Sequence, residues 1–233
     1  WAVMAIAVAG ISLALAALGG RVWMLCRSRE RGLAAVREVR TRTGSRRVHL
    51  GVIDVSATAS IRRFVRSLKA PVVDVIVHNA GVLPDERTET ADGHELTLAT
   101  HVLGPWLLTT LLLPRLRRSG DARVVFVSSG GMYTQTLALS DSEWRDRPYD
   151  GVIAYAQTKR MQVVLAELLA AELADSGICV NAMHPGWADT PAVRTSLPRF
   201  WNVMRRGLRT PAEGADTVAW LAASSAARGQ TGR

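Results

Sequence analysis

The chain has 233 residues and a mass of 25.2 kDa, which suits a single domain, residues 1–233, and leaves little room for a second core. Hydrophobic residues make up 48% and charged residues 21% of the chain, which excludes a disordered or fibrous protein. Its two cysteines, Cys26 and Cys179, lie at no spacing typical of a zinc module or a disulfide scaffold. The sequence therefore predicts a globular protein of a reducing compartment, the cytoplasm, with no metal site.

The formal net charge is +9 at pH 7, and all but two of the 29 basic residues are arginines. The segment from Arg21 to Arg47 holds nine arginines against two glutamates, a local net charge of +7. Aromatic residues make up 6% of the chain, too few for a nucleic-acid stacking platform. We therefore interpret this segment as a solvated helix face beside a phosphate-binding corner, and we expect no nucleic-acid partner.

Residues 1–20 carry no charged side chain, and two interpretations of them remain open. Twenty uncharged, mostly apolar residues are long enough to span a bilayer, which would make the protein membrane-associated. Alternatively, residues 3–8 form a buried parallel strand, the chain turns near Gly10, and a helix ends at Gly19-Gly20. The second interpretation is reasonable because parallel strands covered on both faces read as continuous apolar runs.

From Gly20 onward, short apolar runs alternate with helical patterns. Strands are expected at 21–26, 48–55, 72–77, 123–127 and 178–183, and helices at 28–42, 58–68, 96–113, 154–173 and 212–223. Ser56 is placed to cap the helix that begins at Thr58, and the loop 132–150 is polar with few periodic apolar positions. Repeated β-α units of this length predict an α/β fold, a doubly wound parallel sheet in a three-layer α/β/α arrangement.

Tyr155 and Lys159 stand four residues apart in YAQTK, on one face of a predicted helix. An ammonium group near a tyrosine favours the phenolate, which lowers a pKa that starts near 10. Such a pair makes a proton donor and acceptor usable near neutral pH. The alternative is an exposed tyrosine beside a solvated lysine.

Polar residues follow three of the predicted strands. Ser128-Ser129 ends one strand, the segment 78–81 (HNAG) ends another, and the segment 184–190 (HPGWADT) follows a third. In an open parallel sheet, ligands bind outside the carboxyl ends of the strands. A serine at such an end can donate to a substrate oxygen, although it can also bond its own turn. The three segments therefore predict a single site at one edge of the sheet.

These four motifs together resemble the short-chain dehydrogenase/reductase family, over roughly residues 10 to 233. The segments VSSGGM, YAQTKRMQVVLAE and MHPGWADTPAVR are similar to one narrow branch of it. The resemblance implies a Rossmann-type fold and nicotinamide-dependent oxidoreduction of a small-molecule alcohol, aldehyde or ketone. A homo-oligomer is compatible with such a domain.

The resemblance also implies roles for single residues. Tyr155 would be the general acid in reduction and the base in oxidation, and Lys159 would lower its pKa and bond the nicotinamide ribose. Ser129 matches the family's catalytic serine, which orients and polarises the substrate oxygen. Residues expected to bind the cofactor are Gly10, Arg27, Asp54 (at the adenine), Asn79, Ala80, Gly81, Tyr155, Lys159, Pro185, Gly186 and Thr190 (at the carboxamide).

Arg27 follows the second predicted strand, where NAD enzymes tend to have an acidic residue that binds the ribose 2′-hydroxyl. An arginine there can pair instead with a 2′-phosphate. The cofactor expected is therefore NADP, with NAD the alternative.

Three departures from the family pattern bear on activity. The position of the family's fourth catalytic residue, an asparagine three residues before a glycine, holds His101, which could hold a proton-relay water. The phosphate-loop pattern TGxxxGxG falls on Ala5, Ile6, Gly10 and Ser12, so one of its three glycines remains. The chain also ends at Arg233, near where relatives continue into a last strand, so we expect the sheet to be truncated there. The alternatives to an active enzyme are an inactive or truncated family member and a domain tethered through residues 1–20.

Overall fold

The computed structural model describes residues 2–6, 9–187, 201–202, 204 and 207–233, with side chains from Gly10 onward. Its strands form one six-stranded sheet in the order β3-β2-β1-β4-β5-β6. The strands are β1 (Ala2–Ile6), β2 (Arg21–Cys26), β3 (Val48–Val52), β4 (Val75–His78), β5 (Ala122–Val127) and β6 (Ile178–Met183). Every neighbouring pair is parallel. This order is the doubly wound arrangement that the alternating pattern predicts, with its topological switch point between β1 and β4.

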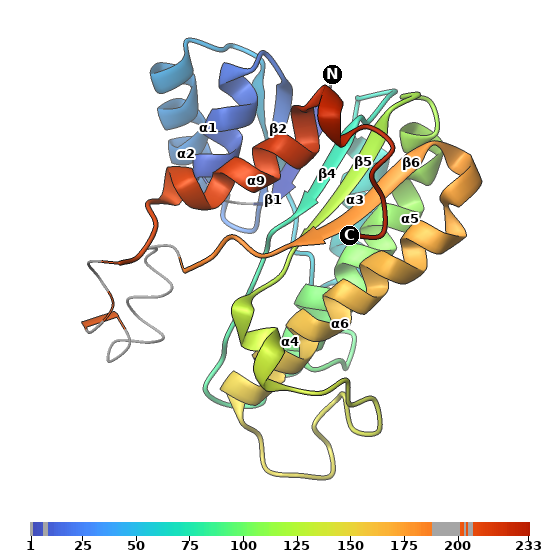
Figure 1. The fold of residues 1–233 in the computed structure, drawn as a ribbon. Helices are drawn as coiled ribbons and strands as arrows, with labels where there is room; N and C mark the ends of the chain where they lie inside the picture. Colours follow the sequence, from blue (N-terminus) through green and yellow to red (C-terminus); the bar gives the residue numbers. More distant parts are fainter. Residues whose placement is uncertain (1, 7–8, 188–200, 203, 205–206) are drawn as a thin grey trace.

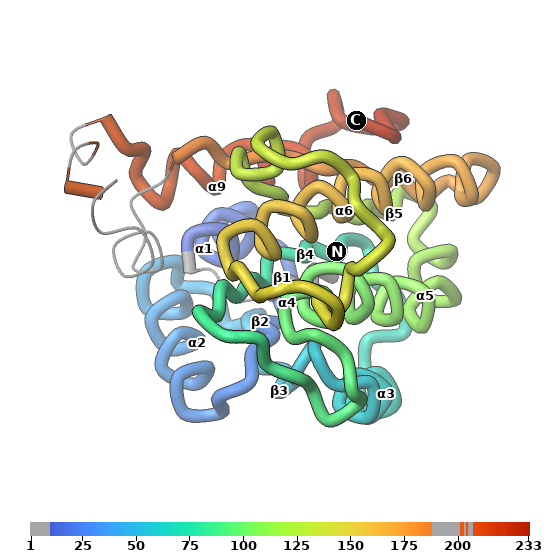
Figure 2. The backbone as a smooth tube through the Cα atoms, turned by 90° about the horizontal axis from the view of Figure 1, so that it is seen from below, coloured from blue at the N-terminus to red at the C-terminus, as the bar shows by residue number. Residues whose placement is uncertain are grey.

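Helices cover both faces of the sheet (Figure 1). One layer holds α1 (Ala9–Ala17), α2 (Arg29–Thr43) and α9 (Pro211–Ala223), and the other holds α3 (Thr58–Ser67), α5 (Gly104–Leu116) and α6 (Gly151–Glu172). Short elements join them: α4 (Leu96–Leu98), η1 (Ala99–Leu103), η2 (Gly130–Thr134), η3 (Ala174–Ser176) and η4 (Ser225–Ala227). Figure 2 shows α1, α2 and α9 on one side of the strands and α3 and α5 on the other. The predicted three-layer α/β/α architecture is confirmed.

The strand β5 shows why the central strands read as continuous apolar runs. Val124 and Phe126 pack into the core on the α3, α5 and α6 side. Val125 and Val127 alternate with them and pack on the α1, α2 and α9 side. Both faces are therefore buried, and burying each such side chain contributes roughly 1.5–3 kcal/mol.

The uncharged N-terminal segment forms a strand and a short helix, as the second interpretation of it predicts, but the strand ends at Ile6, and Gly10 lies within the helix rather than in a turn. Residues 2–6 form β1 between β2 and β4, and residues 9–17 form α1. A Cβ on Gly10 would lie 3.0 Å from the carbonyl oxygen of Pro211, so a glycine lets α1 approach α9 closely. Among the described helices, the continuous stretch Leu96–Leu116 is long and apolar enough to cross a bilayer, but 56% of its apolar 18-residue window is buried in the domain.

The last residues of the chain lie along the outer edge of β6. The Gly232 N–H donates to the Val180 carbonyl at 2.8 Å, and the Ala182 N–H donates to the Arg233 carbonyl at 2.7 Å. The chain therefore begins to pair with β6 in the region where the resemblance places a further strand.

The start of α3 corrects one prediction. Ser56 does not cap this helix, because its hydroxyl donates to Asp54 Oδ1 at 2.6 Å. Asp92, distant in sequence, instead accepts the Thr58 N–H at 2.7 Å and the Thr58 hydroxyl at 3.1 Å. The same Asp54 turn ends β3 at Val52 rather than at the predicted Val55.

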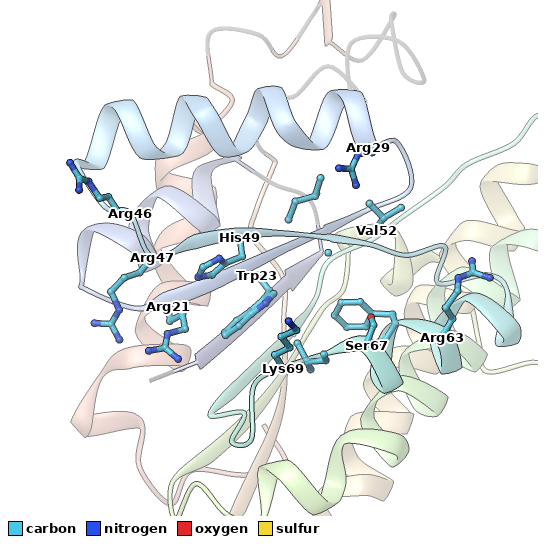
Figure 3. A pocket seen from close by; sticks show the side chains of 14 residues that line it. Arg21, Trp23, Arg29, Arg46, Arg47, His49, Val52, Arg63, Ser67 and Lys69 are labelled. Carbon is cyan, nitrogen blue, oxygen red and sulfur yellow. The ribbon is translucent and has the colours of Figure 1, made fainter.

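A basic groove of about 920 Å³ lies along β3, the edge strand, between α2 and α3 (Figure 3). Its cationic lining residues are Arg21, Arg29, Arg46, Arg47, Arg63 and Lys69. From α2, the Arg40 guanidinium also donates to the Val48 carbonyl at 2.6 and 3.1 Å. Charged side chains along an edge strand discourage it from pairing with another chain. Four of the arginines of the basic segment, Arg21, Arg29, Arg46 and Arg47, therefore line this groove.

Candidate active site

The parallel topology brings the sequence-predicted site residues to one edge of the sheet. Arg27 follows β2, Asp54 follows β3, and the segment 79–81 follows β4. Ser129 follows β5, and Pro185-Gly186 follows β6. The carboxyl ends of parallel strands share one edge, so the predicted clustering at a single edge is what the structure shows.

Tyr155 and Lys159 lie on the same side of α6, close to the backbone after β4. Lys159 Nζ is 5.6 Å from the centre of the Tyr155 ring. A Cβ on Gly81 would lie 3.9 Å from Lys159 Nζ and 4.0 Å from Tyr155 Cε2. The bare backbone of Gly81 therefore faces both side chains, although they come from distant parts of the chain.

The two serines after β5 have different surroundings. Ser128 is buried, and its hydroxyl donates to the Lys159 carbonyl at 2.8 Å. Ser129 is less buried, and its hydroxyl lies close enough to the Tyr155 side chain to lower the pKa of that tyrosine. Its Oγ also accepts the Gly131 N–H at 3.3 Å, which caps η2. Ser128 thus holds α6 against β5, and Ser129 is the serine placed beside the tyrosine.

Lys159 is almost completely buried, with 3% of its surface exposed. Its Nζ donates to the Val127 carbonyl at 2.8 Å and to Gln162 Oε1 at 3.0 Å. Burial lowers the pKa of Lys159 to about 7. Sequence reasoning missed Gln162, although its position one helical turn after Lys159 is the signal that could have found it.

The pKa of Tyr155 departs from the sequence prediction. Burial raises this pKa above its ordinary value, and the hydrogen bond from Ser129 lowers it by less. The sequence predicted that Lys159 would lower this pKa, but burial of the Tyr155 hydroxyl dominates and the pKa is raised. The Tyr155 hydroxyl is therefore protonated at neutral pH.

His101 occupies the position where the family has an asparagine. It lies in η1, a π-helical turn between α4 and α5, and is fully buried. Its ring meets the Tyr155 ring edge-on, with the ring centres 5.3 Å apart and the planes at 87°. His101 is therefore part of the site, although it replaces the expected residue.

The residues expected to bind the cofactor have varied environments. Arg27 is exposed at the end of β2, directly before Ser28, whose hydroxyl caps α2. Asp54 Oδ1 accepts two hydrogen bonds from Ser56. Gly186 has φ +74°, and a Cβ there would lie 3.0 Å from Arg209 Nε, so a glycine suits this turn. Thr190 lies outside the described residues.

The loop 135–150 is anchored beside the site by carboxylates that sequence reasoning missed. Glu143 Oε2 accepts the Glu95 N–H at 2.7 Å, and Glu143 Oε1 pairs with His94 Nδ1 at 2.8 Å. The Tyr149 hydroxyl donates to Glu95 Oε1 at 3.1 Å. Glu95 is fully buried and also accepts two N–H groups of α4. This polar loop is therefore fixed against the helix that leads to His101.

A Rossmann-type sheet with a tyrosine, a lysine and a serine at its carboxyl edge defines a class of nucleotide-dependent oxidoreductase domains. Comparison with known proteins agrees with this class. A family model described as short chain dehydrogenase matches residues 7–199. The chain therefore belongs to the short-chain dehydrogenase/reductase family, as its motifs predict.

Individual relatives show which members of this family the chain is similar to. Dehydrogenase/reductase SDR family member 12 from Bos taurus is 41% identical over 94% of this chain and 69% of its own length. This is the branch that the late motifs resemble. Retinol dehydrogenase 11 from Homo sapiens is 33% identical over 87% of this chain and 65% of its own length. The solved structure of L-sorbose reductase from Gluconobacter frateurii, complexed with NADPH and L-sorbose, has a TM-score of 0.78 at 20% identity. It covers 99% of this chain and 92% of its own, and it supports the fold.

Proposed function

We propose that the chain is an NADP-dependent oxidoreductase that acts on a carbonyl or alcohol group, with Tyr155 as general acid and base. The observation that carries this proposal is the meeting of Tyr155, Ser129 and Lys159 beside the bare backbone of Gly81. A Cβ on Gly81 would fill part of this space. In this proposal the nicotinamide that the family implies binds at this carboxyl edge of the sheet.

In this proposal the bound nicotinamide supplies the hydride. The chain's own residues orient the substrate and move a proton. Ser129 donates to the substrate oxygen, and the Tyr155 hydroxyl gives that oxygen a proton as the carbonyl is reduced. Lys159 fixes the ribose side of the cofactor from its buried position on α6.

The protonation state of Tyr155 supports reduction as the direction favoured near neutral pH. A general acid must hold its proton before the reaction, and burial raises the pKa of Tyr155. A general base needs the phenolate, so alcohol oxidation requires a higher pH. We expect the reduction rate to fall and the oxidation rate to rise as pH increases through the pKa of Tyr155.

The preference for NADP rests on Arg27. Its exposed guanidinium at the carboxyl end of β2 can pair with a 2′-phosphate. Arg27→Ala should lower NADPH affinity and leave NADH affinity unchanged, with Arg37→Ala, on the exposed part of α2, as control. Equal affinity of the wild-type chain for NADH and NADPH would refute the preference.

The altered phosphate loop leads us to expect that the chain binds the cofactor pyrophosphate weakly. Ile6 stands at the position of the first glycine of the phosphate-loop pattern. It still belongs to β1, where it pairs with Leu25 of β2. Gly10 packs against the Pro211 carbonyl, and Ser12 is fully buried. Each lost backbone-phosphate hydrogen bond weakens binding by roughly 1.5–3 kcal/mol. Replacing Ala5 by Thr and both Ile6 and Ser12 by Gly should therefore raise NADPH affinity about tenfold or more. Tight binding by the unchanged chain would contradict this part of the proposal and favour contacts from another segment.

The substrate class we propose is a small-molecule alcohol, aldehyde or ketone. Similarity to a protein named as a retinol dehydrogenase supports an alcohol or its aldehyde as the substrate.

For the location of the protein we propose a reducing compartment such as the cytoplasm, because both cysteines are free thiols.

The test of the proposed function is Tyr155→Phe. Phenylalanine keeps the ring contact with His101 and removes only the hydroxyl, so the fold should persist while kcat falls about a hundredfold or more. Tyr133→Phe is the matched control, because Tyr133 is 72% exposed. Wild-type kcat in Tyr155→Phe, on any substrate that the wild type reduces with NADPH, would overturn the assignment.

A further inference from the structure

His101 departs in chemical type from the asparagine of the family pattern, and its surroundings define a specific role. It lies three residues before Gly104, within the π-helical turn η1. π-helical turns inside longer helices occur frequently at functional sites. Gly104, which directly follows this turn, lets the helix lie against the chain at Val55, because a Cβ there would collide with the carbonyl of Val55.

The hydrogen bonds of His101 fix the position of its proton. The Val82 N–H donates to Nε2 at 3.1 Å, so Nε2 carries no hydrogen. In the neutral ring the proton must then sit on Nδ1, which lies 2.8 Å from Thr158 Oγ1. The Thr158 Oγ1 can accept a hydrogen bond from Nδ1–H because its own hydrogen is donated to the Ala154 or the Tyr155 carbonyl, 2.9 and 3.0 Å away. With either of these acceptors for the Thr158 hydroxyl, the hydrogen bonds of the neutral ring require the proton on Nδ1.

The charge state of His101 agrees with that arrangement. The ring is fully buried, and burial together with the nearby Lys159 holds the pKa of His101 well below its usual range. A protonated ring would place a second hydrogen on Nε2, against the Val82 N–H. The neutral Nδ1–H form is therefore the form that the surroundings accept.

These bonds connect the two segments that carry the site. Val82 follows Gly81, whose backbone faces the tyrosine and the lysine, and Thr158 directly precedes Lys159 on α6. His101 thus links the loop after β4 to α6, the helix that carries Tyr155 and Lys159. Its edge-on contact also supports the Tyr155 ring. Small displacements of reacting groups can cost about a hundredfold in rate, so such a connection bears directly on turnover.

We propose that His101 is a positioning residue, which sets the distance between Gly81 and the Tyr155–Lys159 pair through Val82 and Thr158 and relays no proton. The expected proton-relay water at His101 is thereby replaced, since both ring nitrogens are used by protein groups. This proposal rests on the proposed function for its kinetic consequence, but its structural content stands apart from any activity.

The first experiment reads the histidine directly. In protein labelled with ¹⁵N-histidine, the His101 ring should give the Nδ1–H pattern without titrating between about pH 5 and 8. Thr158→Val should change the His101 Nδ1 signal. The matched control is Thr109→Val, which removes the partner of another buried histidine, His78, whose Nε2 lies 2.7 Å from Thr109 Oγ1. An Nε2–H pattern, or titration of His101 in that range, would overturn the proposal.

The second experiment follows the NMR signal of the Tyr155 ring. The chain has three tyrosines, so selective labelling resolves the Tyr155 ring signal. His101→Asn and Thr158→Val should both shift this signal, whereas Thr109→Val should not. An unchanged Tyr155 signal in both site variants would contradict the positioning role, even if the wild-type chain shows no turnover with NADPH.

The third experiment separates positioning from proton relay by kinetics. His101→Asn restores the family residue but is too short to keep both hydrogen bonds, so kcat should fall about tenfold or more with little change in the KM for NADPH. The effects of His101→Asn and Thr158→Val should be non-additive, because they break the same connection. Undiminished kcat in His101→Asn would show that the relay chemistry of the family operates here and would refute the proposal.

Discussion

The buried Lys159 predicts a specific pH dependence of stability. Burial lowers its pKa to about 7 in the folded chain, whereas the unfolded chain has the ordinary value of about 10.4. Between these two values the unfolded chain binds more protons than the folded chain, so the free energy of unfolding rises with pH. As far as Lys159 is concerned, the folded chain is most stable above about pH 10.4, where the lysine is neutral in both states. Its contribution to the free energy of unfolding falls as pH decreases and is lost by about pH 7.

The magnitude follows from the two pKa values. Each pH unit in this window changes the free energy of unfolding by about 1.4 kcal/mol, so the change from pH 7 to 9.5 is of order 3 kcal/mol. In Lys159→Met this contribution disappears. The variant also loses the hydrogen bonds to Val127 and Gln162, but that loss does not vary with pH. The difference in unfolding free energy between wild type and variant therefore isolates the titration.

The assay is urea denaturation at intervals from pH 6 to about 9.5, with linear extrapolation. The chain supplies its own control, because its only other lysine, Lys69, is exposed. Lys69→Met should differ from wild type by an amount that stays constant with pH. A constant difference for Lys159→Met as well would refute the reasoning that Lys159 is buried and destabilised in its charged form.

Three further predictions test packing and anchoring. Gly104→Ala should destabilise the fold by about 1–3 kcal/mol or more, because the new methyl group meets the Val55 carbonyl, while Gly207→Ala, whose Cβ would lie 3.7 Å from its nearest neighbour, should have little effect; equal urea midpoints would contradict this. Ser12→Ala should stabilise the chain by about 1 kcal/mol, because the buried Ser12 hydroxyl has no partner among the described residues; lower stability would show that the hydroxyl is bonded. Glu143→Ala should raise the substrate KM several-fold without changing NADPH affinity, because it releases the loop 135–150; an unchanged KM would separate this loop from the substrate.

The sequence was sufficient to predict the sheet and the clustering of the site. Continuous apolar runs such as β5 could be recognised because parallel strands are buried on both faces. Tyr155 and Lys159 could be placed on one face of a helix because helical periodicity fixes it. These features depend on local pattern; the sheet is confirmed, and the described residues of the candidate site lie where the pattern places them.

The features that sequence reasoning missed depend on tertiary contacts. The cap of α3 comes from the distant Asp92, so nothing near Ser56 could indicate it. The raised pKa of Tyr155 results from desolvation, which no spacing of residues reveals. Likewise, the role of Glu143 requires its approach to Glu95 across the loop.

The most direct test of the central claim is hydride transfer itself. The chain would be incubated with NADPH that carries deuterium at the transferable position and with an aldehyde, and the alcohol product would be analysed by mass spectrometry. The account predicts deuterium on the carbinol carbon with the wild-type chain and about a hundredfold less deuterated product with Tyr155→Phe. Equal deuterium transfer by the two proteins would contradict the account, as would aldehyde reduction by the wild type without deuterium in the product.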